Sequence, residues 1–389
     1  MKVYIFTRQP MPNGMAGTNR IKCYARALHS VGVSCGIFVF SRDEGNHLAC
    51  GDIDGVQFRY MLGFSRRWAS ILGKIQTILM MVALYVKLLF CLKKDDVVFE
   101  YSRESYKFVN LIIKLTHFKQ AKYVSELCEI PGLGFTHKEA IEENKYIESR
   151  LFPQYDGVIA ISGSLAHYAK QHCTNYCKII EVPVLVDSKA FQLTNDERLI
   201  KEPYIFYSGS FDDQKDGTIG MFQAFCKVAN TVTSTLKFVC TGTKEAALQV
   251  GYLSKYIQDE KLERSLIFTG YLKQAEIIKY LADCEMVVSS RYTNEQTSNG
   301  FSTKLAEYAA AGKAIVMTPV GEAAKWFHDG DDCLMIPEHN SDALVEAILY
   351  LLNNKDERVN LGEGARKMCY KSFDYKVWGE PMKAFFETL

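Results

Sequence analysis

Short β-rich runs alternate with helical stretches along this 389-residue chain from one end to the other. Such alternation is typical of parallel sheets that are covered by helices. The series is interrupted once, by the polar stretch 184–203, which has no clear period. A chain of this length suits two domains of roughly 150 to 200 residues each. The sequence therefore predicts an α/β protein with two doubly wound, Rossmann-like domains that face each other across a cleft.

We place the domain boundary inside this polar stretch. Residues 1–185 then form an amino-terminal domain, residues 186–373 form a carboxyl-terminal domain, and residues 374–389 form a closing helix that packs back toward the first domain. The expected strands are 3–6, 35–40, 56–61, 97–101, 123–126, 158–161 and 179–182 in the first domain, and 204–207, 236–240, 266–269, 286–289, 314–317 and 334–336 in the second.

The charges of the chain are balanced, with 46 Lys and Arg against 45 Asp and Glu. No whole-protein field exists to hold a polyanion, so we expect no nucleic-acid partner.

The twelve cysteines include no CxxC pair, and Cys173 and Cys177 lack the second pair that a zinc site requires. We therefore expect no metal. Residues 1–7 resemble a strand rather than a signal peptide. Scattered cysteines without disulfide partners are typical of proteins in a reducing compartment, so we expect a cytoplasmic protein.

The longest apolar run, 78–92, has 15 residues and contains Lys87. A spanning helix needs about 20 residues, so we expect no span. Cationic residues flank the run: Arg66, Arg67 and Lys74 before it, Lys93 and Lys94 after it. A basic-flanked apolar helix can lie in the interface of an anionic membrane, at the inner face of the cell membrane. The alternative, which we favour, is a helix buried against the sheet of its own domain.

Each domain has a glycine-containing loop after its first strand. Gly14 and Gly17 allow a close backbone approach next to a helix amino end, which favours a phosphate. This loop has only G-x-x-G, whereas an NAD site requires G-x-G-x-x-G, so we expect no dinucleotide cofactor. In the second domain Gly209 and Ser210 follow the strand, and Lys215 supplies a compact cation for the charge that develops on a diphosphate leaving group.

The most informative block is 299–316. Its pattern predicts a polar loop, then a helix that begins near Ser302 or Thr303, then a strand. Gly300, Ser302 and Thr303 offer backbone donors and hydroxyl groups to phosphate oxygens at the helix amino end. Glu307 lies about one turn into the helix, where its carboxylate can accept two hydrogen bonds from a ribose diol. The block therefore suits a nucleotide.

Together with 208–217 and Gly321-Glu322, this block resembles the retaining glycosyltransferases of family GT4. The family pattern G-x-[SP]-x-K-L-x-E-Y-M-A-x-G-[KL]-P-V-V matches residues 300–316, with Ala314 where proline is usual. The resemblance covers the carboxyl-terminal domain and, more loosely, the amino-terminal one.

The resemblance implies a GT-B fold, a UDP- or GDP-sugar donor held mainly by the second domain, an acceptor held mainly by the first, and no cofactor or obligatory metal. Lys215 corresponds to the diphosphate-binding basic residue of the family, and Glu307 matches the second glutamate of its E-x7-E motif, a ribose binder. The nucleobase is expected at Tyr271 and Leu272. The donor site that we expect comprises Gly14, Gly17, Gly209, Ser210, Lys215, Tyr271, Leu272, Asn299, Gly300, Phe301, Ser302, Thr303, Lys304 and Glu307.

The sequence departs from the family pattern at two positions. Asn299 replaces the first glutamate of E-x7-E, and Ser210 stands where an arginine often precedes the lysine by five positions. The first position normally contacts the transferred sugar, so the donor sugar stays open.

The mechanism implied by the resemblance needs no side-chain nucleophile. Lys215 and the backbone at 300–303 stabilise the departing diphosphate, and the acceptor hydroxyl attacks the same face, with retention. Glu126 and Glu129, at the end of a strand, are candidates to orient or deprotonate the acceptor. The alternative for each is a solvated or capping carboxylate.

The expected function is a hexosyltransferase (EC 2.4) that acts on a lipid-linked or polysaccharide acceptor in bacterial surface glycan synthesis. One alternative is an NDP-sugar 2-epimerase of the same fold, which Asn299 and the K-L-A-E-Y signature disfavour. The other is a non-catalytic nucleotide-sugar-binding subunit, which only the loss of the first glutamate supports.

Overall fold

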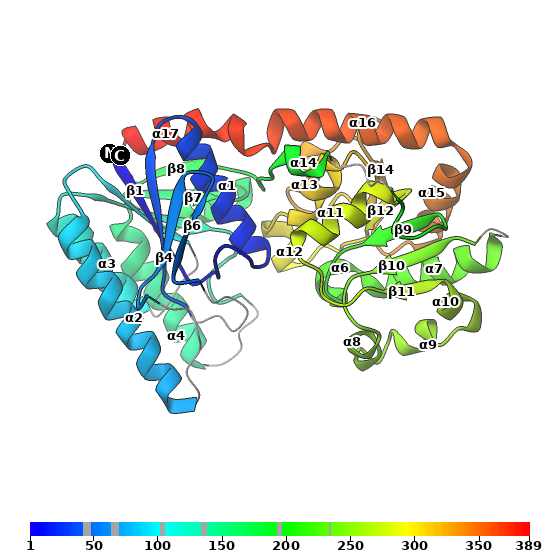
Figure 1. Ribbon diagram of the computed structural model, residues 1–389, viewed down its shortest axis with the longest axis horizontal. Helices are drawn as coiled ribbons and strands as arrows, with labels where there is room; N and C mark the ends of the chain where they lie inside the picture. The colour runs from blue at the N-terminus through cyan, green and yellow to red at the C-terminus, as the bar shows by residue number, and fades with distance from the viewer. Residues whose placement is uncertain (42–47, 64–69, 102–105, 134–137, 193–196, 233–234) are drawn as a thin grey trace. The chain divides into compact units, whose positions relative to one another are not determined.

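The computed structural model describes residues 1–41, 48–63, 70–101, 106–133, 138–192, 197–232 and 235–389. The chain forms two compact units. Unit 1 comprises Met1–Leu185 and Tyr375–Leu389, and unit 2 comprises Val186–Asp374 (Figure 1). Arg66 and Arg67, which flank the apolar run, lie outside the described residues.

Unit 1 is built on an eight-stranded sheet with the order β3-β4-β2-β1-β5-β6-β7-β8. All pairs are parallel except β3 with β4. The strands are β1 (Lys2–Thr7), β2 (Ser34–Val39), β3 (Cys50–Ile53), β4 (Val56–Tyr60), β5 (Val97–Tyr101), β6 (Lys122–Leu127), β7 (Gly157–Ala160) and β8 (Lys178–Glu181).

Strand β3 is the one strand of the described residues that the sequence analysis does not predict. Its four residues, Cys-Gly-Asp-Ile, include two types that are depleted in strands. The strand forms because Asp54 and Gly55 both have positive φ, 49° and 90°, and close a tight hairpin with β4. Asp-Gly is a favoured pair for such a turn. This turn signal could have revealed the hairpin.

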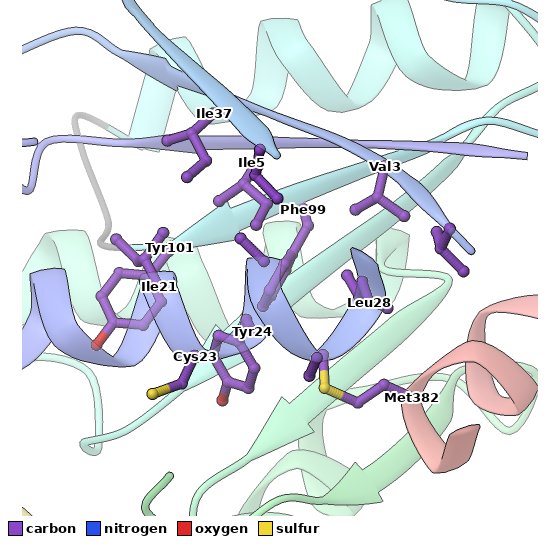
Figure 2. Packing of buried hydrophobic residues seen from close by; sticks show 14 of the residues in the cluster. Val3, Ile5, Ile21, Cys23, Tyr24, Leu28, Ile37, Phe99, Tyr101 and Met382 are labelled. Carbon is purple, nitrogen blue, oxygen red and sulfur yellow. The ribbon is translucent and has the colours of Figure 1, made fainter. Parts of the chain in front are cut away.

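Helices cover both faces of this sheet. On one face α1 (Ala16–Ser30) and α17 (Gly379–Glu387) pack against Val3 and Ile5 of β1, and Figure 2 shows Tyr24 and Met382 in this core. Side chains alternate along a strand, so Phe6 points to the other face, where Phe40 links it to Phe108 of α3. The other helices of unit 1 are α2 (Ser70–Cys91), α3 (Tyr106–Phe118), α4 (Lys138–Tyr146) and α5 (Gly163–His172), with shorter turns η1 (Ile147–Leu151), η2 (Phe152–Gln154) and η4 (Tyr375–Trp378).

Unit 2 has a six-stranded, fully parallel sheet with the order β11-β10-β9-β12-β13-β14. Its strands are β9 (Tyr204–Tyr207), β10 (Lys237–Cys240), β11 (Leu266–Phe268), β12 (Met286–Ser289), β13 (Ala314–Met317) and β14 (Leu334–Met335). Its helices are α6 (Asp213–Asp216), α7 (Thr218–Thr231), α8 (Lys244–Gln249), α9 (Ser254–Ile257), α10 (Glu260–Ser265), α11 (Gln274–Asp283), α12 (Glu295–Asn299), α13 (Thr303–Ala310), α14 (Ala323–Trp326), α15 (Ser341–Asn353) and α16 (Lys355–Ser372), with the turn η3 (Ser188–Phe191). Both units are doubly wound α/β folds, which confirms the predicted fold class.

The strand order of unit 2 reverses direction at β9. Strand β10 lies on one side of β9, and β12 lies on the other. In open parallel sheets, ligands bind outside the carboxyl ends of the strands at such a switch point. The loops that follow β9 and β12 therefore mark the first place to look for a site.

Helix α2 corrects our interpretation of the apolar run. The helix begins at Ser70, so its 22 residues extend well before Ile78. Among the described residues it is the one helix that is long and apolar enough to cross a membrane, and 22% of the segment Leu72–Cys91 is buried. Length and composition alone do not show a span. The favoured alternative, a helix buried against its own sheet, is wrong for most of the helix surface, because burial is confined to one stripe.

Candidate donor site in unit 2

The loops after β9 and β12 are joined at the switch point. A Cβ atom at Gly217, which has φ +63°, would lie 1.7 Å from the carbonyl oxygen of Ser290. Only glycine permits this close approach. The Arg291 Nε donates to the carbonyl oxygen of Lys215 at 2.9 Å, and the Asn294 side chain donates to the carbonyl oxygen of Gln214 at 2.6 Å. The backbone that carries Lys215 is therefore held by the neighbouring loop.

Asp216 is the centre of a buried polar cluster. Its Oδ1 contacts the Lys304 Nζ at 2.7 Å, and its Oδ2 accepts a hydrogen bond from the Tyr207 hydroxyl at 2.8 Å. The Ser210 Oγ lies 3.5 Å from the same Oδ2. A Cβ atom at Gly209 would lie 2.5 Å from both the Lys304 Nζ and the Tyr207 hydroxyl, so the cluster needs glycine there.

Three cations gather around this one carboxylate. Burial lowers the pKa of Lys304, and the nearby Arg291 and Lys215 lower it further, while Asp216 opposes the shift. Burial likewise lowers the pKa of Arg291. Lys304 is thus buried beside two further cations, and Asp216 is the carboxylate that offsets part of their charge. An anionic ligand is the natural complement of this cluster.

The amino end of α13 adds backbone donors to the same region. Ser302 is the N-cap residue, but its side chain accepts no hydrogen bond from the first turn, and that turn contains no acidic residue. The amino-terminal N–H groups of a helix carry partial positive charge and bind phosphate. Lys304, in the first turn, connects these donors to Asp216. The predicted residues 302–304 therefore meet Lys215, Gly209 and Ser210 at one place.

Glu307 lies one turn further along α13. It is partly buried, and burial raises the pKa of its carboxyl group to about 7, although the Gln274 side chain donates a hydrogen bond to it and Lys304 attracts it. Gln274 is the first residue of α11, directly after the loop that contains Tyr271 and Leu272. Glu307 is therefore connected to the segment in which we expect the nucleobase. The Tyr271 side chain is 84% exposed.

Two predicted site residues have other contacts in the structure. The Asn299 side chain donates to the carbonyl oxygen of Glu295 at 2.7 Å, at the end of α12. The Phe301 side chain is buried and packs edge-on against Phe373, with ring centroids 5.5 Å apart. The side chain of Phe301 therefore anchors the loop to Phe373. Gly321 touches the same loop, since a Cβ atom there would lie 3.1 Å from the carbonyl oxygen of Gly300.

The remaining predicted residues lie in unit 1. Gly14 is in the loop after β1, and Gly17 is in the first turn of α1. Glu129 is exposed after β6. These residues belong to the other unit, so their roles stay predictions.

Glu126 forms a buried ion pair. Its Oε1 lies 2.5 Å from the Arg20 Nε, and the two side chains are 0% and 3% exposed. The Tyr24 hydroxyl donates to Oε1 at 3.0 Å, and the Cys128 thiol donates to Oε2 at 3.0 Å. Burial raises the pKa of that thiol, so it keeps its proton. This environment differs from the solvated or capping position considered as the alternative, and it favours a structural role for Glu126.

Arg291 and Asp216 are site residues that the sequence analysis missed. Each follows a strand of the switch point, Arg291 directly after Ser289-Ser290 and Asp216 between Lys215 and Gly217. A charged residue in a loop that follows a strand of the switch point is the sequence feature that could have indicated each of them. Their pairing partners lie 76 and 88 residues away in the sequence, so the contacts themselves could not be anticipated.

The described residues contain no group of three or more His, Cys, Asp or Glu side chains that could hold a metal ion. The cluster in unit 2 is cationic and holds one close carboxylate, which suits an anion.

Comparison with known proteins finds a family match within unit 2. Residues 202–354 match the family model for glycosyl transferases group 1, and all of them lie in unit 2. An uncharacterized glycosyltransferase of Methanocaldococcus jannaschii is 20% identical over 263 residues, which are 66% of this chain and 64% of that protein. The chain thus spans just under two thirds of this relative's length.

Solved structures show the fold of the whole chain. Sucrose-phosphate synthase from Thermosynechococcus elongatus matches with a TM-score of 0.76 and 14% identity, covering 99% of this chain and 98% of that one. Anabaena HepE in complex with UDP matches with a TM-score of 0.70 and 14% identity, covering 100% of both chains. The fold is that of the GT-B glycosyltransferases. The family match covers part of the chain, and the solved structures show its fold.

The raised pKa of Glu307 predicts a pH dependence of stability. The folded value of about 7 lies above the ordinary value of 4.5, so the native state binds this proton more tightly than the unfolded state. Stability is therefore lost as pH rises from about 4.5 through 7. We expect wild type to lose up to about 3 kcal/mol relative to Glu307→Gln over this range. Denaturant unfolding at a series of pH values measures the difference, and parallel curves for the two proteins would contradict the assignment.

Proposed function

We propose that this protein is a retaining glycosyltransferase of the GT4 type, which transfers a hexose from a nucleotide diphosphate sugar to a glycan or lipid-linked acceptor. The observation that carries the proposal is the cluster of Lys215, Arg291 and Lys304 beside the amino end of α13. A diphosphate has the charge and the oxygen acceptors that this cluster complements.

The nucleoside is assigned to the adjoining part of unit 2. The ribose diol donates to the Glu307 carboxylate, and the base lies near Tyr271 and Leu272. Glu307 and this loop are connected through Gln274, which supports a single continuous nucleotide site. Crystal structures of Anabaena HepE contain UDP, UDP with glucose, and UDP-glucose. They make UDP-glucose the first donor to test, ahead of a GDP-sugar.

Catalysis in this proposal is charge stabilisation on the leaving group. As the bond between the sugar and the diphosphate breaks, negative charge accumulates on the diphosphate oxygens, and Lys215 with the backbone donors of 300–303 stabilises it. The acceptor hydroxyl attacks from the same face, so the product keeps the anomeric configuration of the donor. Glu129 in unit 1 remains our candidate for orienting the acceptor. We propose a cytoplasmic enzyme of surface glycan synthesis.

The first experiment is a thermal-shift screen with UDP, GDP, ADP and their sugars. A ligand at a hundredfold excess over its dissociation constant stabilises the native state by about 2.7 kcal/mol. We expect one nucleotide to raise Tm in wild type and in the control Glu346→Ala, whose side chain is exposed on α15, and to have little effect on Glu307→Ala. No shift with any nucleotide would refute the proposal.

Turnover then separates the proposal from its alternatives. A transferase releases nucleotide diphosphate in proportion to glycosylated acceptor. An epimerase converts the donor into a second nucleotide sugar when no acceptor is present. Binding without either product across a panel of acceptors would assign the chain to a non-catalytic subunit.

A further inference from the structure

Helix α2 exposes apolar side chains on the side opposite its buried stripe. The buried stripe consists of Gln76, Met80, Leu84 and Leu88, each fully buried. The exposed apolar side chains of α2 are Leu72, Ile75, Ile78, Leu79, Val82, Val86 and Phe90, and those of the adjacent α3 are Leu111 and Phe118. We call these nine residues the α2–α3 face. Figure 1 shows α2 as a long helix on the outside of unit 1.

The exposed residues of α2 form one continuous surface. At about 100° per residue, the seven positions fall within an arc of about 120°, and the centre of this arc lies opposite the buried stripe. A water-facing helix carries polar residues on that side. Phe90, which is 83% exposed, and Phe118, which is 79% exposed, are large aromatic members of the face. A face of this kind marks an interaction site rather than a solvated surface.

The charged residues within α2 and α3 are all cationic. Neither α2 nor α3 contains an Asp or Glu residue. Lysines lie on both flanks and at the helix ends: Lys74, Lys87, Lys93, Lys94, Lys107, Lys114 and Lys119. Asp95 and Asp96 follow α2 in the chain. Asp95 is exposed beside Lys94, whereas Asp96 is buried and accepts hydrogen bonds from the backbone N–H groups of Lys2 and Lys93.

The positive charge continues into a cavity beside the end of α2. This cavity, of about 690 Å³, is lined by Lys87 and Cys91 of α2 and by residues of β1, β2, β3 and β4. Lys2 and Arg59 add two cations to its lining, and Asp52 is its one carboxylate. Its lining therefore has the charge to hold a phosphate group beside the carboxyl end of α2, on the side of the buried stripe.

These observations favour one occupant over the others. In a symmetric dimer the same patch meets itself, so the lysines of two copies would face each other. If α2 crossed a membrane, the residues of its buried stripe would lose their packing inside unit 1. An anionic lipid surface matches both properties of the face, because apolar side chains enter the interface while lysines bind the headgroups. We infer that the α2–α3 face docks unit 1 on an anionic membrane, with α2 lying in the plane of the interface.

Vesicle binding tests this inference without reference to the transferase activity. The full chain is mixed with phosphatidylcholine vesicles that contain either no phosphatidylglycerol or 30% of it, an amount of about one lipid in three that gives a strongly anionic surface. We expect preferential binding to the anionic vesicles and release by alkaline carbonate. The double variant Ile78→Asp/Val82→Asp should lower the partition coefficient at least tenfold. Replacement of Lys74 and Lys87 by Gln should lower it about fivefold per lysine.

The matched control is Leu199→Asp/Val359→Asp in unit 2. Its two side chains are 47% and 48% exposed, against 59% and 53% for Ile78 and Val82, so both double variants should keep the wild-type Tm. The control should bind vesicles as wild type does. Equal binding by the two double variants would overturn the inference, as would a wild-type dimer that dissociates in Ile78→Asp/Val82→Asp without any vesicle binding. Retention after carbonate treatment would contradict the interfacial position. UDP binding reports on the proposed function separately.

Discussion

Replacement of Lys215 by alanine is expected to lower kcat by a factor of about 10² to 10³, while the dissociation constant of the nucleotide changes by less than about tenfold. Removing one group that stabilises charge in the transition state has an effect of this size, since the stabilisation is larger there than in the ground state. The Lys215 backbone is fixed by Arg291 and by the close contact of Gly217 with Ser290. Its loss should therefore remove a charge without moving the loop.

Steady-state kinetics and nucleotide titration together check this result. Lys227→Ala is the matched control, because Lys227 pairs with Asp342 at 2.5 Å on the surface of the same unit, with both side chains well exposed. Surface pairs contribute little, so this variant should keep kcat within about twofold. Lys215→Arg should restore part of the lost activity. If the Lys215→Ala enzyme keeps the wild-type kcat, the prediction is wrong, and Lys304 or Arg291 would be the residue that stabilises the charge.

Replacement of Arg20 by methionine is expected to destabilise unit 1 by about 3 to 5 kcal/mol. The change leaves the Glu126 carboxylate buried without its cation, and an uncompensated buried charge has a cost of this order. It also removes the hydrogen bonds from the Arg20 guanidinium to the carbonyl oxygens of Pro183 at 2.6 Å and Val182 at 2.9 Å. Calorimetry measures the effect, with the transition of unit 2 as an internal reference.

The double variant Arg20→Met/Glu126→Met distinguishes the two roles of Glu126. Replacing both members of a buried pair by apolar residues is often neutral or stabilising, so most of the lost stability should return. If Glu126 is structural, transferase activity returns as well, and Glu129→Gln is the variant that impairs the acceptor side. If activity stays lost in a stable double variant, Glu126 has the catalytic role that the sequence suggested.

Most of the architecture could be predicted from local patterns. The strands around Val3 and Tyr204, for example, are buried on both faces, and such strands appear in a sequence as continuous apolar runs. The block that contains Ser302 and Glu307 combines a helix start with the residue types that bind phosphate and ribose, so its local structure was foreseeable. Strand β3 was not predicted, because Gly51 and Asp52 are poor strand formers and only pairing with β4 stabilises them.

The contacts of the charged residues could not be predicted in the same way. Glu126 lies near the carboxyl end of β6, where a site residue is expected in a parallel sheet. Nothing nearby in the sequence indicates that its partner is Arg20, 106 residues away. Asp216 and Lys304 are 88 residues apart. The periodicity of α2 likewise shows an apolar helix, but which of its sides is buried depends on where the sheet and α3 lie.

The sequence by itself determined the alternation of strands and helices, the position of the boundary stretch and the helix start at Ser302 and Thr303, because each depends on neighbours within one or two turns. The tertiary structure decided the buried pairing of Glu126, the gathering of Lys215, Arg291 and Lys304 around Asp216, and the exposure of the α2–α3 face. These depend on which distant segments are brought together when parallel strands close the sheet, and that choice is made by the packing of the whole unit.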